Sequence, residues 1–422
     1  MGNQLFRAFR SRNYKLYFSG QSLSLVGTWM QRTAVYWLVF ELTNSAFMLG
    51  VTVFAAQFPS FLFSMFGGVI SDRYNRFNVL LITQIASLLQ AATLALLAYS
   101  GAYEVWHILA LTIFLGIINA FDVPARQALV YDMVASKDDM ANAIALNSSM
   151  VHAARLIGPA LSGLVLESFG ASTCFSLNVV SFLAVIASLL FMRLPPYKNP
   201  TRTHNAFTDL LNGYRYLRDT PSIGYVMLML ALVSLFSLPY VTLLPVYAKD
   251  VFAGSASTFG YLNSFVGVGA LGGALFLASL RSGTNLKRIL FINTVVFGLG
   301  LILFSHSKNM SLAMPFMILT GFGMMSQTTI SNTLIQTTVT PAMRGRVISY
   351  YAMAFFGMQP IGGLLVGAIS TEIGAPNTLL LQGIYTILIA LIFLPFLRGR
   401  KLKDSDKMKM DQLEERSVET MG

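Results

Sequence analysis

Apolar segments of about 20 residues follow one another along almost the whole chain, and they constrain its fold more than any other feature. About 20 consecutive apolar residues in a helix match the roughly 30 Å hydrocarbon core of a bilayer. Only 11% of the 422 residues are charged, against about 25% in a soluble globular protein. We therefore predict an all-α membrane protein rather than a set of soluble domains.

Twelve such segments can be assigned, with boundaries good to about 2–4 residues. The expected transmembrane helices are Tyr14–Leu42, Ser45–Ile70, Val79–Tyr99, Val105–Val130, Ala141–Leu166, Ala171–Met192, Ile223–Ala248, Phe259–Leu280, Ile289–Ser305, Leu312–Val339, Val347–Ile369 and Thr378–Leu397. A longer polar gap after the sixth segment predicts an N-terminal six-helix bundle over 1–193 and a C-terminal one over 221–397. Between them we expect a cytoplasmic linker over 194–220, and after them a charged cytoplasmic tail over 398–422.

The linker has an amphipathic stretch, because apolar residues recur there at helical spacing: Phe207, Leu210, Leu211, Tyr214 and Leu217. Such a pattern predicts a helix lying on the inner membrane surface.

The basic residues fix the orientation in the membrane. With both termini inside, 24 of the 29 Lys and Arg residues fall in cytoplasmic segments, and only Lys249 and Lys308 fall outside. Basic residues collect on the cytoplasmic side of membrane proteins. We therefore expect a multi-pass protein with cytoplasmic N- and C-termini, and the net charge of +11 does not call for a nucleic-acid partner.

The two halves resemble copies of one another. Leu115-Gly116 and Thr320-Gly321 are 205 residues apart, and Gly163 and Gly170 recur 204 residues later as Gly367 and Gly374. Parallel six-helix repeats place a substrate path along the seam between the halves, near the midplane. We therefore predict two pseudo-symmetric halves around a central path.

Charged residues well inside the expected spans, away from the span ends, are concentrated in the first half. They are Arg32, Asp122, Arg126 and Arg155, and a charge at a helix centre costs ~2.5–3.5 kcal/mol on insertion scales. Asp122 is the only carboxylate well inside a span, so it is the first candidate to carry a proton, with His152 the second. The alternative is that Asp122 and Arg126, four residues apart on one helix face, form a fixed ion pair holding the fourth and fifth helices in register.

Three cations against one anion in the spans hint at an anionic or zwitterionic substrate. Arg32, Arg126 and Arg155 are accordingly candidates for ion pairing or substrate binding, and Arg32 could instead pair at the outer gate. Uncharged polar residues that could line the cavity are Gln31, Asn119, Asn147, Gln327, Asn332, Gln336 and Gln359. The sequence shows no metal-ligand cluster, nucleotide-binding loop or Ser/His/Asp arrangement, so we expect no enzyme activity and no cofactor other than the proton as coupling ion.

The loop between the second and third helices reads Gly67-Gly68-Val69-Ile70-Ser71-Asp72-Arg73-Tyr74-Asn75-Arg76-Phe77. Glycine allows helices to approach closely, and asparagine tolerates a left-handed backbone in a tight turn. The loop resembles the signature G-x-x-[AS]-D-R-x-x-R of the major facilitator superfamily of transporters. We expect Gly68, Asp72, Arg73 and Arg76 to form a cytoplasmic gate with Arg344 and Arg346, the Asp72 carboxylate facing the start of the eleventh helix.

Further stretches narrow the resemblance. Gly158-Pro159-x-x-Ser162-Gly163 is similar to the G-P-x-x-G-G pattern of antiporters in this superfamily, and Gly158, Pro159 and Gly163 are expected to bend their helix. The stretches Gly27-Thr28-Trp29-Met30-Gln31, Asp122-x-Pro124-Ala125-Arg126-Gln127 and Arg344-Gly345-Arg346-Val347 resemble the branch of enterobactin-exporter-like proteins and transmembrane secretion effectors.

That resemblance implies a bacterial inner-membrane exporter of siderophores, macrolides and other drugs, commonly driven by the proton gradient. We accordingly predict a monomeric secondary active exporter that works by alternating access and moves a siderophore-like or drug-like small molecule by proton antiport. The alternatives are a lipid or lysolipid flippase on the same fold and a non-catalytic membrane receptor.

Overall fold

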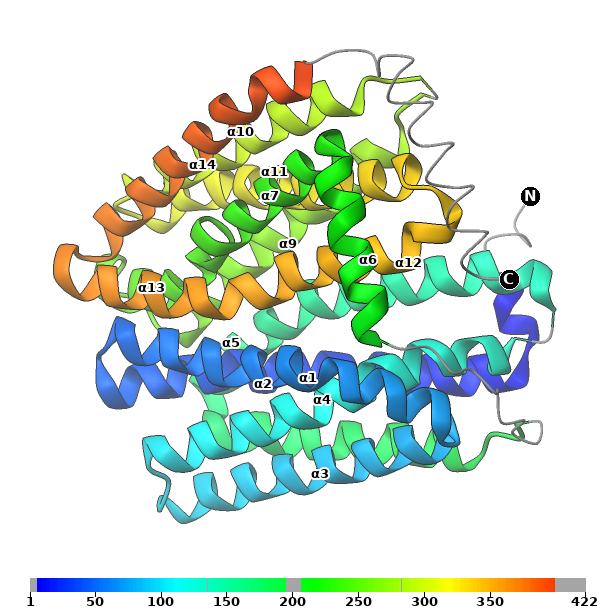
Figure 1. Ribbon diagram of the computed structural model, residues 1–422. Coiled ribbons are helices and arrows are strands. Elements are labelled where there is room, and N and C mark those ends of the chain that lie inside the picture. The colour runs from blue at the N-terminus through cyan, green and yellow to red at the C-terminus, as the bar shows by residue number, and fades with distance from the viewer. Residues whose placement is uncertain (1–5, 135, 195–205, 282, 399–422) are drawn as a thin grey trace.

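The computed structural model describes residues 6–134, 136–194, 206–281 and 283–398, and within those ranges every regular element is helical (Figure 1). The first half of the chain contains η1 (Arg7–Arg10), α1 (Arg12–Thr43), α2 (Ala46–Arg73), α3 (Arg76–Ser100), α4 (Val105–Met133), η2 (Lys137–Asp139) and α5 (Met140–Leu190). The second half contains α6 (Ala206–Asp219), α7 (Pro221–Phe236), η3 (Leu238–Leu243), α8 (Leu244–Val246), η4 (Tyr247–Val251), α9 (Ala256–Ala278), α10 (Leu286–Ser305), α11 (Met310–Thr338), α12 (Pro341–Ala352), η5 (Met353–Gly357), α13 (Met358–Ile373) and α14 (Ala375–Arg398).

Nine helices in the described ranges are long and apolar enough to cross a membrane. One of them, α5, has 51 residues and contains a non-helical residue, Gly170, with φ 80° and ψ 175°. A straight helix of that length would be more than twice as long as the hydrocarbon core is thick, so α5 is two helices joined at Gly170. The chain is thus a multi-pass membrane protein. The helices α1 and α11 are also long enough to span, at 32 and 29 residues, although they are not among the nine.

Corresponding glycines in the two halves share their backbone conformation and their packing. Gly374 has φ 81°, close to the 80° of Gly170, which lies 204 residues earlier. An added Cβ at Gly163 would lie 2.8 Å from the carbonyl oxygen of Ala256 on α9, and one at Gly367 would lie 2.6 Å from that of Ala46 on α2. The spacing noted in the sequence therefore relates pairs of glycines that end helices and allow close approach in the same way.

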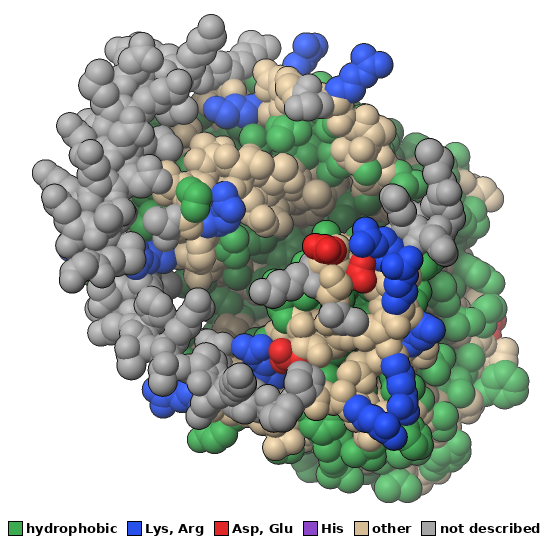
Figure 2. Space-filling view, turned by 90° about the vertical axis from the view of Figure 1, so that its right-hand side faces the viewer, with side chains coloured by type: hydrophobic (Ala, Val, Ile, Leu, Met, Phe, Trp, Pro, Cys, Tyr) green, Lys and Arg blue, Asp and Glu red, His purple; other side chains and the backbone are tan. Residues whose placement is uncertain are grey.

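The two groups of helices touch at one end of the molecule and diverge at the other. We call the end that holds η1, the Tyr74–Asn75 turn, α6 and the start of α12 the basic end. Interhalf contacts lie toward the opposite end: α2 packs on α13 through Gly50 and Gly363, and α5 packs on α9 through Gly163 and Gly260. Seen from the basic end, Figure 2 shows a hollow between the halves with Lys and Arg side chains around it.

The distribution of buried apolar residues agrees with this geometry. One hydrophobic cluster joins the second half to residues of the first that lie toward the opposite end, among them Trp37, Leu49 and Val53. A separate cluster, which includes Tyr14, Leu80 and Leu129, lies in the first half alone, toward the basic end. The ring of Trp37 stacks on that of Phe259 across the contact, with centroids 6.3 Å apart. Among the described residues, the apolar core is therefore continuous between the halves only toward the opposite end.

The loop between α2 and α3 is compact, but its turn differs from the expectation in one detail. An added Cβ at Gly67 would lie 1.9 Å from the carbonyl oxygen of Ala120 on α4, so this glycine is needed for close packing, whereas nothing lies within 4 Å of one at Gly68. Asn75 has φ −61° and caps α3 by accepting a hydrogen bond from the Phe77 N–H at 3.0 Å. The prediction of a left-handed backbone at Asn75 was therefore wrong. The Asn75 side chain instead stabilises the start of α3.

The expected linker helix forms as α6 and packs along α12. An added Cβ at Gly213 would lie 2.9 Å from the ring of Tyr350, and the hydroxyl of Tyr216 accepts a hydrogen bond from the Thr340 N–H at 3.5 Å. The side chains of residues 206–210, which include two of the apolar positions named above, lie outside the described residues. The contacts that are described attach α6 to the second half.

The glycine contact at the opposite end gives a testable prediction. In Gly50→Ala the new Cβ would lie 2.5 Å from the carbonyl oxygen of Gly363, and backbone cannot yield as a flexible side chain can. We expect α2 and α13 to separate, so that spin labels on Leu42 and Ile373 report a longer mean distance between the halves.

The matched control is Gly272→Ala on α9, where the nearest atom to the added methyl group is a ring carbon of Phe322 at 3.8 Å, an ordinary van der Waals distance. It should leave the label distance unchanged. Equal distances in Gly50→Ala and the parent protein would contradict the assigned role of this contact.

Candidate functional site

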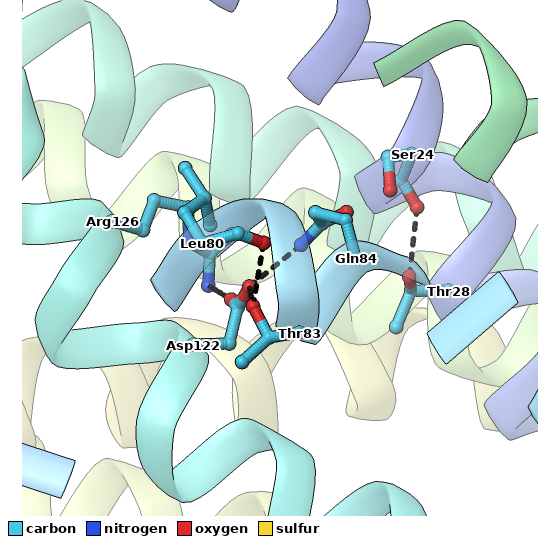
Figure 3. A network of polar contacts seen from close by, with 7 residues as sticks. All are labelled: Ser24, Thr28, Leu80, Thr83, Gln84, Asp122 and Arg126. Carbon is cyan, nitrogen blue, oxygen red and sulfur yellow. Dashed lines mark hydrogen bonds and ion pairs between the residues drawn. The ribbon is translucent and has the colours of Figure 1, made fainter. Parts of the chain in front are cut away.

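Asp122 lies in a buried polar cluster between α3 and α4 (Figure 3). Its side chain is 6% exposed, and its Oδ2 pairs with the Arg126 guanidinium at 3.2 Å. Its Oδ1 accepts hydrogen bonds from the Gln84 amide at 2.6 Å and the Thr83 hydroxyl at 3.1 Å. Both oxygens of the carboxylate therefore have polar partners.

This arrangement changes one of the two interpretations of Asp122. The ion pair with Arg126 exists, but it is within α4, and the further partners come from α3 rather than from the fifth helix. As a structural link the pair therefore holds α4 against α3, and the expected link to the fifth helix is corrected accordingly.

The cluster also has a place for a proton. The Thr83 hydroxyl lies 2.8 Å from the carbonyl oxygen of Leu80 as well as 3.1 Å from Asp122. A hydroxyl has one hydrogen and two acceptor sites. If Asp122 took up a proton, Thr83 could donate to Leu80 and accept from the carboxylic acid without any side chain moving. Arg126, whose side chain is 18% exposed, links this pair to solvent.

A second charged cluster lies where α1 meets α5. The guanidinium carbon of Arg32 is 5.2 Å from the ring centroid of Trp29, and that of Arg155 is 5.7 Å from the same ring. Arg32 also donates from Nε to the Tyr36 hydroxyl at 3.0 Å. The close approach of the helices depends on Gly158, because an added Cβ there would lie 2.5 Å from the Cβ of Trp29.

This arginine cluster lies at the closed end of the hollow. Leu156, the neighbour of Arg155, contacts Gly267 of α9, and its carbonyl oxygen accepts a hydrogen bond from Ser264 at 3.1 Å. Contacts between α5 and α9 continue from there toward the opposite end. Arg32 and Arg155 are both half-buried, so they sit where the packed interface stops and the hollow begins.

Gln31 does not line the hollow, although the sequence suggested that it could. It is 2% exposed, donates to Gln90 at 2.9 Å and accepts from Asn178 at 2.8 Å. Gln90 in turn donates to the Leu111 carbonyl at 3.1 Å. This buried amide network ties α1, α3, α4 and α5 together, so the role of Gln31 is structural.

The remaining candidates of the first half are dispersed. Asn147 accepts a hydrogen bond from the Tyr14 hydroxyl at 3.1 Å and so joins α5 to α1. His152 is half-buried one turn before Arg155, and Asn119 is half-buried on α4 one turn before Asp122. Among the described residues, no hydrogen bond or ion pair joins His152 to the Asp122 cluster.

In the second half, Gln327 takes the position that Asp122 has in the first. The helices α4 and α11 each have 29 residues and begin 205 residues apart, which relates Asp122 to Gln327 and Arg126 to Ser331. Gln327 and Ser331 are fully buried and find no hydrogen-bond partner among the described residues. Gln327 therefore lies in the core of its half and not on a cavity wall.

Two other candidates of the second half do reach solvent. Gln336 is exposed and donates to Asn332 at 2.9 Å on the same face of α11. Gln359 is half-buried on α13.

The expected gate residues lie at the basic end. Arg76 forms an ion pair with Asp132 at 3.5 Å, which joins the start of α3 to the end of α4. Arg73 and Arg344 are exposed, and Arg346 is half-buried beside α6. The side chain of Asp72 lies outside the described residues, so its predicted contact with the eleventh span stays a prediction.

Gly158, Pro159 and Gly163, which were expected to bend their helix, have helical backbone angles, and the two glycines make close contacts with other helices. Gly170 is the only residue in α5 with non-helical backbone angles, so the helix continues through Pro159. Gly158 packs on α1 and Gly163 on α9, as described above. These residues therefore hold three helices together.

Sequence reasoning missed Thr83, Gln84, Gln90 and Asn178. Each is a polar residue within an apolar segment, and that was the signal available, since buried polar groups need partners. The sequence alone could not show which helix face each residue occupies.

Comparison with known proteins agrees with this architecture. The family model described as transmembrane secretion effector, of the major facilitator superfamily, matches residues 4–421. The chain is 28% identical to the staphyloferrin A transporter of Staphylococcus aureus (strain NCTC 8325 / PS 47) over 92% of this chain and 97% of that one. It is 25% identical to the enterobactin exporter EntS of Escherichia coli O1:K1 / APEC, over 90% and 91%, and 24% identical to macrolide efflux protein A of Streptococcus pyogenes, over 90% and 96%.

Solved transporter structures share the fold. The nucleoside transporter NupG, in a mutant form, superposes with a TM-score of 0.74 at 15% identity, over 91% of this chain and 98% of that one. A bacterial homologue of the lysosomal transporter Spinster, in an inward-facing and unoccupied conformation, gives 0.72 at 14% identity, over 92% and 97%. The chain therefore belongs to the transmembrane secretion effector family of the major facilitator superfamily.

Proposed function

We propose that this protein is a secondary active exporter that moves a siderophore-like or drug-like small molecule by alternating access. One observation carries the proposal: the halves meet only toward the opposite end, and a hollow open at the basic end stops at a cluster of two arginines and a tryptophan. A closed end with an accessible cluster is the geometry of one state of a rocking-bundle transporter. The named relatives, which are exporters of siderophores and a macrolide efflux protein, support outward transport.

The same proposal includes the topology. If the basic end faces the cytoplasm, in keeping with the distribution of Lys and Arg, the conformation is open to the cytoplasm and both termini are cytoplasmic. Counting α5 as two helices, and adding α1 and α11, gives twelve crossings in two halves of six. We place the protein in a bacterial inner membrane as a monomer.

We further propose that Asp122 carries the coupling proton. Three features support this role: Asp122 is the only carboxylate deep within a described span, it is paired with the partly exposed Arg126, and the Thr83 hydroxyl could accept a hydrogen bond from the protonated acid. Asp122 has three polar partners in this conformation, so we expect these contacts to change when the hollow opens to the other side.

The test of the function as a whole is transport by purified protein in proteoliposomes. The interior of the vesicles is made acidic. Protons leaving the vesicles then drive substrate inward through those protein molecules whose cytoplasmic side faces outward. A panel of siderophores and macrolides should include at least one compound that is taken up. Uptake that is no greater than in protein-free liposomes for every compound, or flipping of dye-labelled lipid instead, would contradict the proposal.

Asp122→Asn gives the prediction for coupling. The amide keeps the size of the side chain but cannot exchange a proton, so uptake driven by a pH gradient should fall at least about ten-fold while exchange of labelled for unlabelled substrate continues. The control is Glu104→Gln, an acid-to-amide change at the opposite end of α4, which should leave both unchanged. Coupled uptake at the parent rate in Asp122→Asn would exclude this residue as the proton carrier.

Asp72→Asn tests the cytoplasmic gate. A carboxylate at a helix N-terminus stabilises by ~0.3–1 kcal/mol, or up to ~2 kcal/mol when partly buried, so an Asp72 contact with the start of the eleventh span would favour the state closed at the basic end. We expect the variant to shift the population further toward the state open at that end and to transport more slowly. A normal transport rate would show that the latch does not operate.

A further inference from the structure

The charges inside the described spans do not balance. Asp122 and Arg126 neutralise each other at 3.2 Å, which leaves Arg32 and Arg155. Neither arginine has an ion-pair partner among the described residues, and no carbonyl or side chain described here accepts a hydrogen bond from the Arg155 guanidinium. Two like charges therefore share one small region that lies deep in the bundle.

Both guanidinium groups rest against the same ring. Their distances from the Trp29 centroid, 5.2 and 5.7 Å, mean that they cannot be farther apart than the sum of these values. The ring face attracts cations, and Tyr36 accepts one hydrogen bond from Arg32. These contacts hold the two arginines in position, but they supply no negative charge.

The unused donors remain accessible. The nitrogen atoms of Arg32 and Arg155 that make no hydrogen bond are absent from the buried atoms without partners in the described ranges, so each keeps contact with solvent. The cluster lies where the hollow ends, beside Leu156 and the packed contact with α9. A molecule entering from the basic end would therefore meet guanidinium N–H groups of both arginines that make no hydrogen bond to the described residues.

We infer that this arginine cluster, Arg32, Arg155 and Trp29, binds a small organic anion that bears at least two carboxylate groups. Planar guanidinium groups match carboxylates in bidentate geometry, and two of them beside one indole ring fit two carboxylates of one molecule better than a single inorganic ion. Trp29 offers an apolar face to the carbon skeleton between them. This inference names the substrate class of the proposed exporter, so its biological meaning rests on that proposed function. Binding of the anion can be tested independently of transport.

A binding role and a purely structural role for the two arginines predict opposite changes in the melting temperature when an arginine is replaced. Arginines that hold helices together are paired, and removing one partner of a buried pair is strongly destabilising. Here each arginine faces a like charge, so replacing either by glutamine should leave the melting temperature of the ligand-free protein unchanged or higher. A fall in melting temperature for both Arg32→Gln and Arg155→Gln would overturn the inference.

Trp29 provides the binding readout. It is one of three tryptophans, so replacing Trp37 and Trp106 with phenylalanine leaves it as the only indole. Citrate and succinate, titrated against the detergent-purified protein, should change its fluorescence saturably, whereas triethyl citrate and diethyl succinate should not. Loss of a charge-assisted interaction corresponds to about ten-fold to one-hundred-fold in affinity, and we expect that loss in both glutamine variants.

Arg281→Gln is the matched control, because it removes one positive charge from an exposed position at the basic end. It should bind citrate as the parent protein does. The inference is overturned if the esters act as well as the acids, or if Arg281→Gln weakens binding as much as Arg155→Gln does.

Failure of this inference can be separated from failure of the proposed function. If citrate binds beside Trp29 and no compound is transported in proteoliposomes, the anion site stands and the exporter does not. If the protein exports a neutral or cationic compound, and Arg155→Gln leaves that export unchanged, the exporter stands and the anion site does not.

Discussion

The rest of this structure depends on where charged side chains lie within the membrane, because the hydrocarbon core solvates charge poorly. Four charged side chains lie deep within the described spans, and the protein stabilises them in two different ways. Asp122 and Arg126 are adjacent on one helix and receive further hydrogen bonds from α3. Arg32 and Arg155 are instead left facing the Trp29 ring, with no ion-pair partner among the described residues. The first arrangement is self-contained, and the second is complete only with another molecule.

Close helix packing is what makes the second arrangement possible. Gly158 brings α5 onto α1 so that arginines from both helices reach Trp29, and Gly163 and Gly260 then join α5 to α9 just beyond the cluster. Small residues drive such contacts in membranes, where apolar side chains gain little by leaving lipid. The same glycines therefore close one end of the bundle and position the charges at the end of the hollow.

Much of this could be predicted from the sequence, because lipid restricts the choices severely. Segment length gave the helices, and the glycines at an offset of 204 gave positions that prove to share a positive φ and a similar packing role. The family assignment from the loop Gly67–Phe77 was confirmed. The helix face on which a single polar residue lies was harder to predict. Gln31 and Gln327 were expected at the cavity, but they lie in the cores of their halves. A helix that is apolar on every side carries no periodic signal to show which face is buried.

The comparison of the two halves explains why the charges are confined to one of them. At the position of Asp122 the second half has Gln327, and at that of Arg126 it has Ser331, both fully buried. A neutral amide in the same place keeps the packing of the repeat but cannot change charge as the halves move. Under the proposed coupling, the charge that changes lies in the first half, and the two arginines without an ion-pair partner among the described residues lie in that half as well. A proton on Asp122 would leave Arg126 without its partner and raise the positive charge of the half that holds the arginine cluster. An anion bound there would feel that change through a low-dielectric interior, which gives a physical route by which proton and substrate could affect one another without touching.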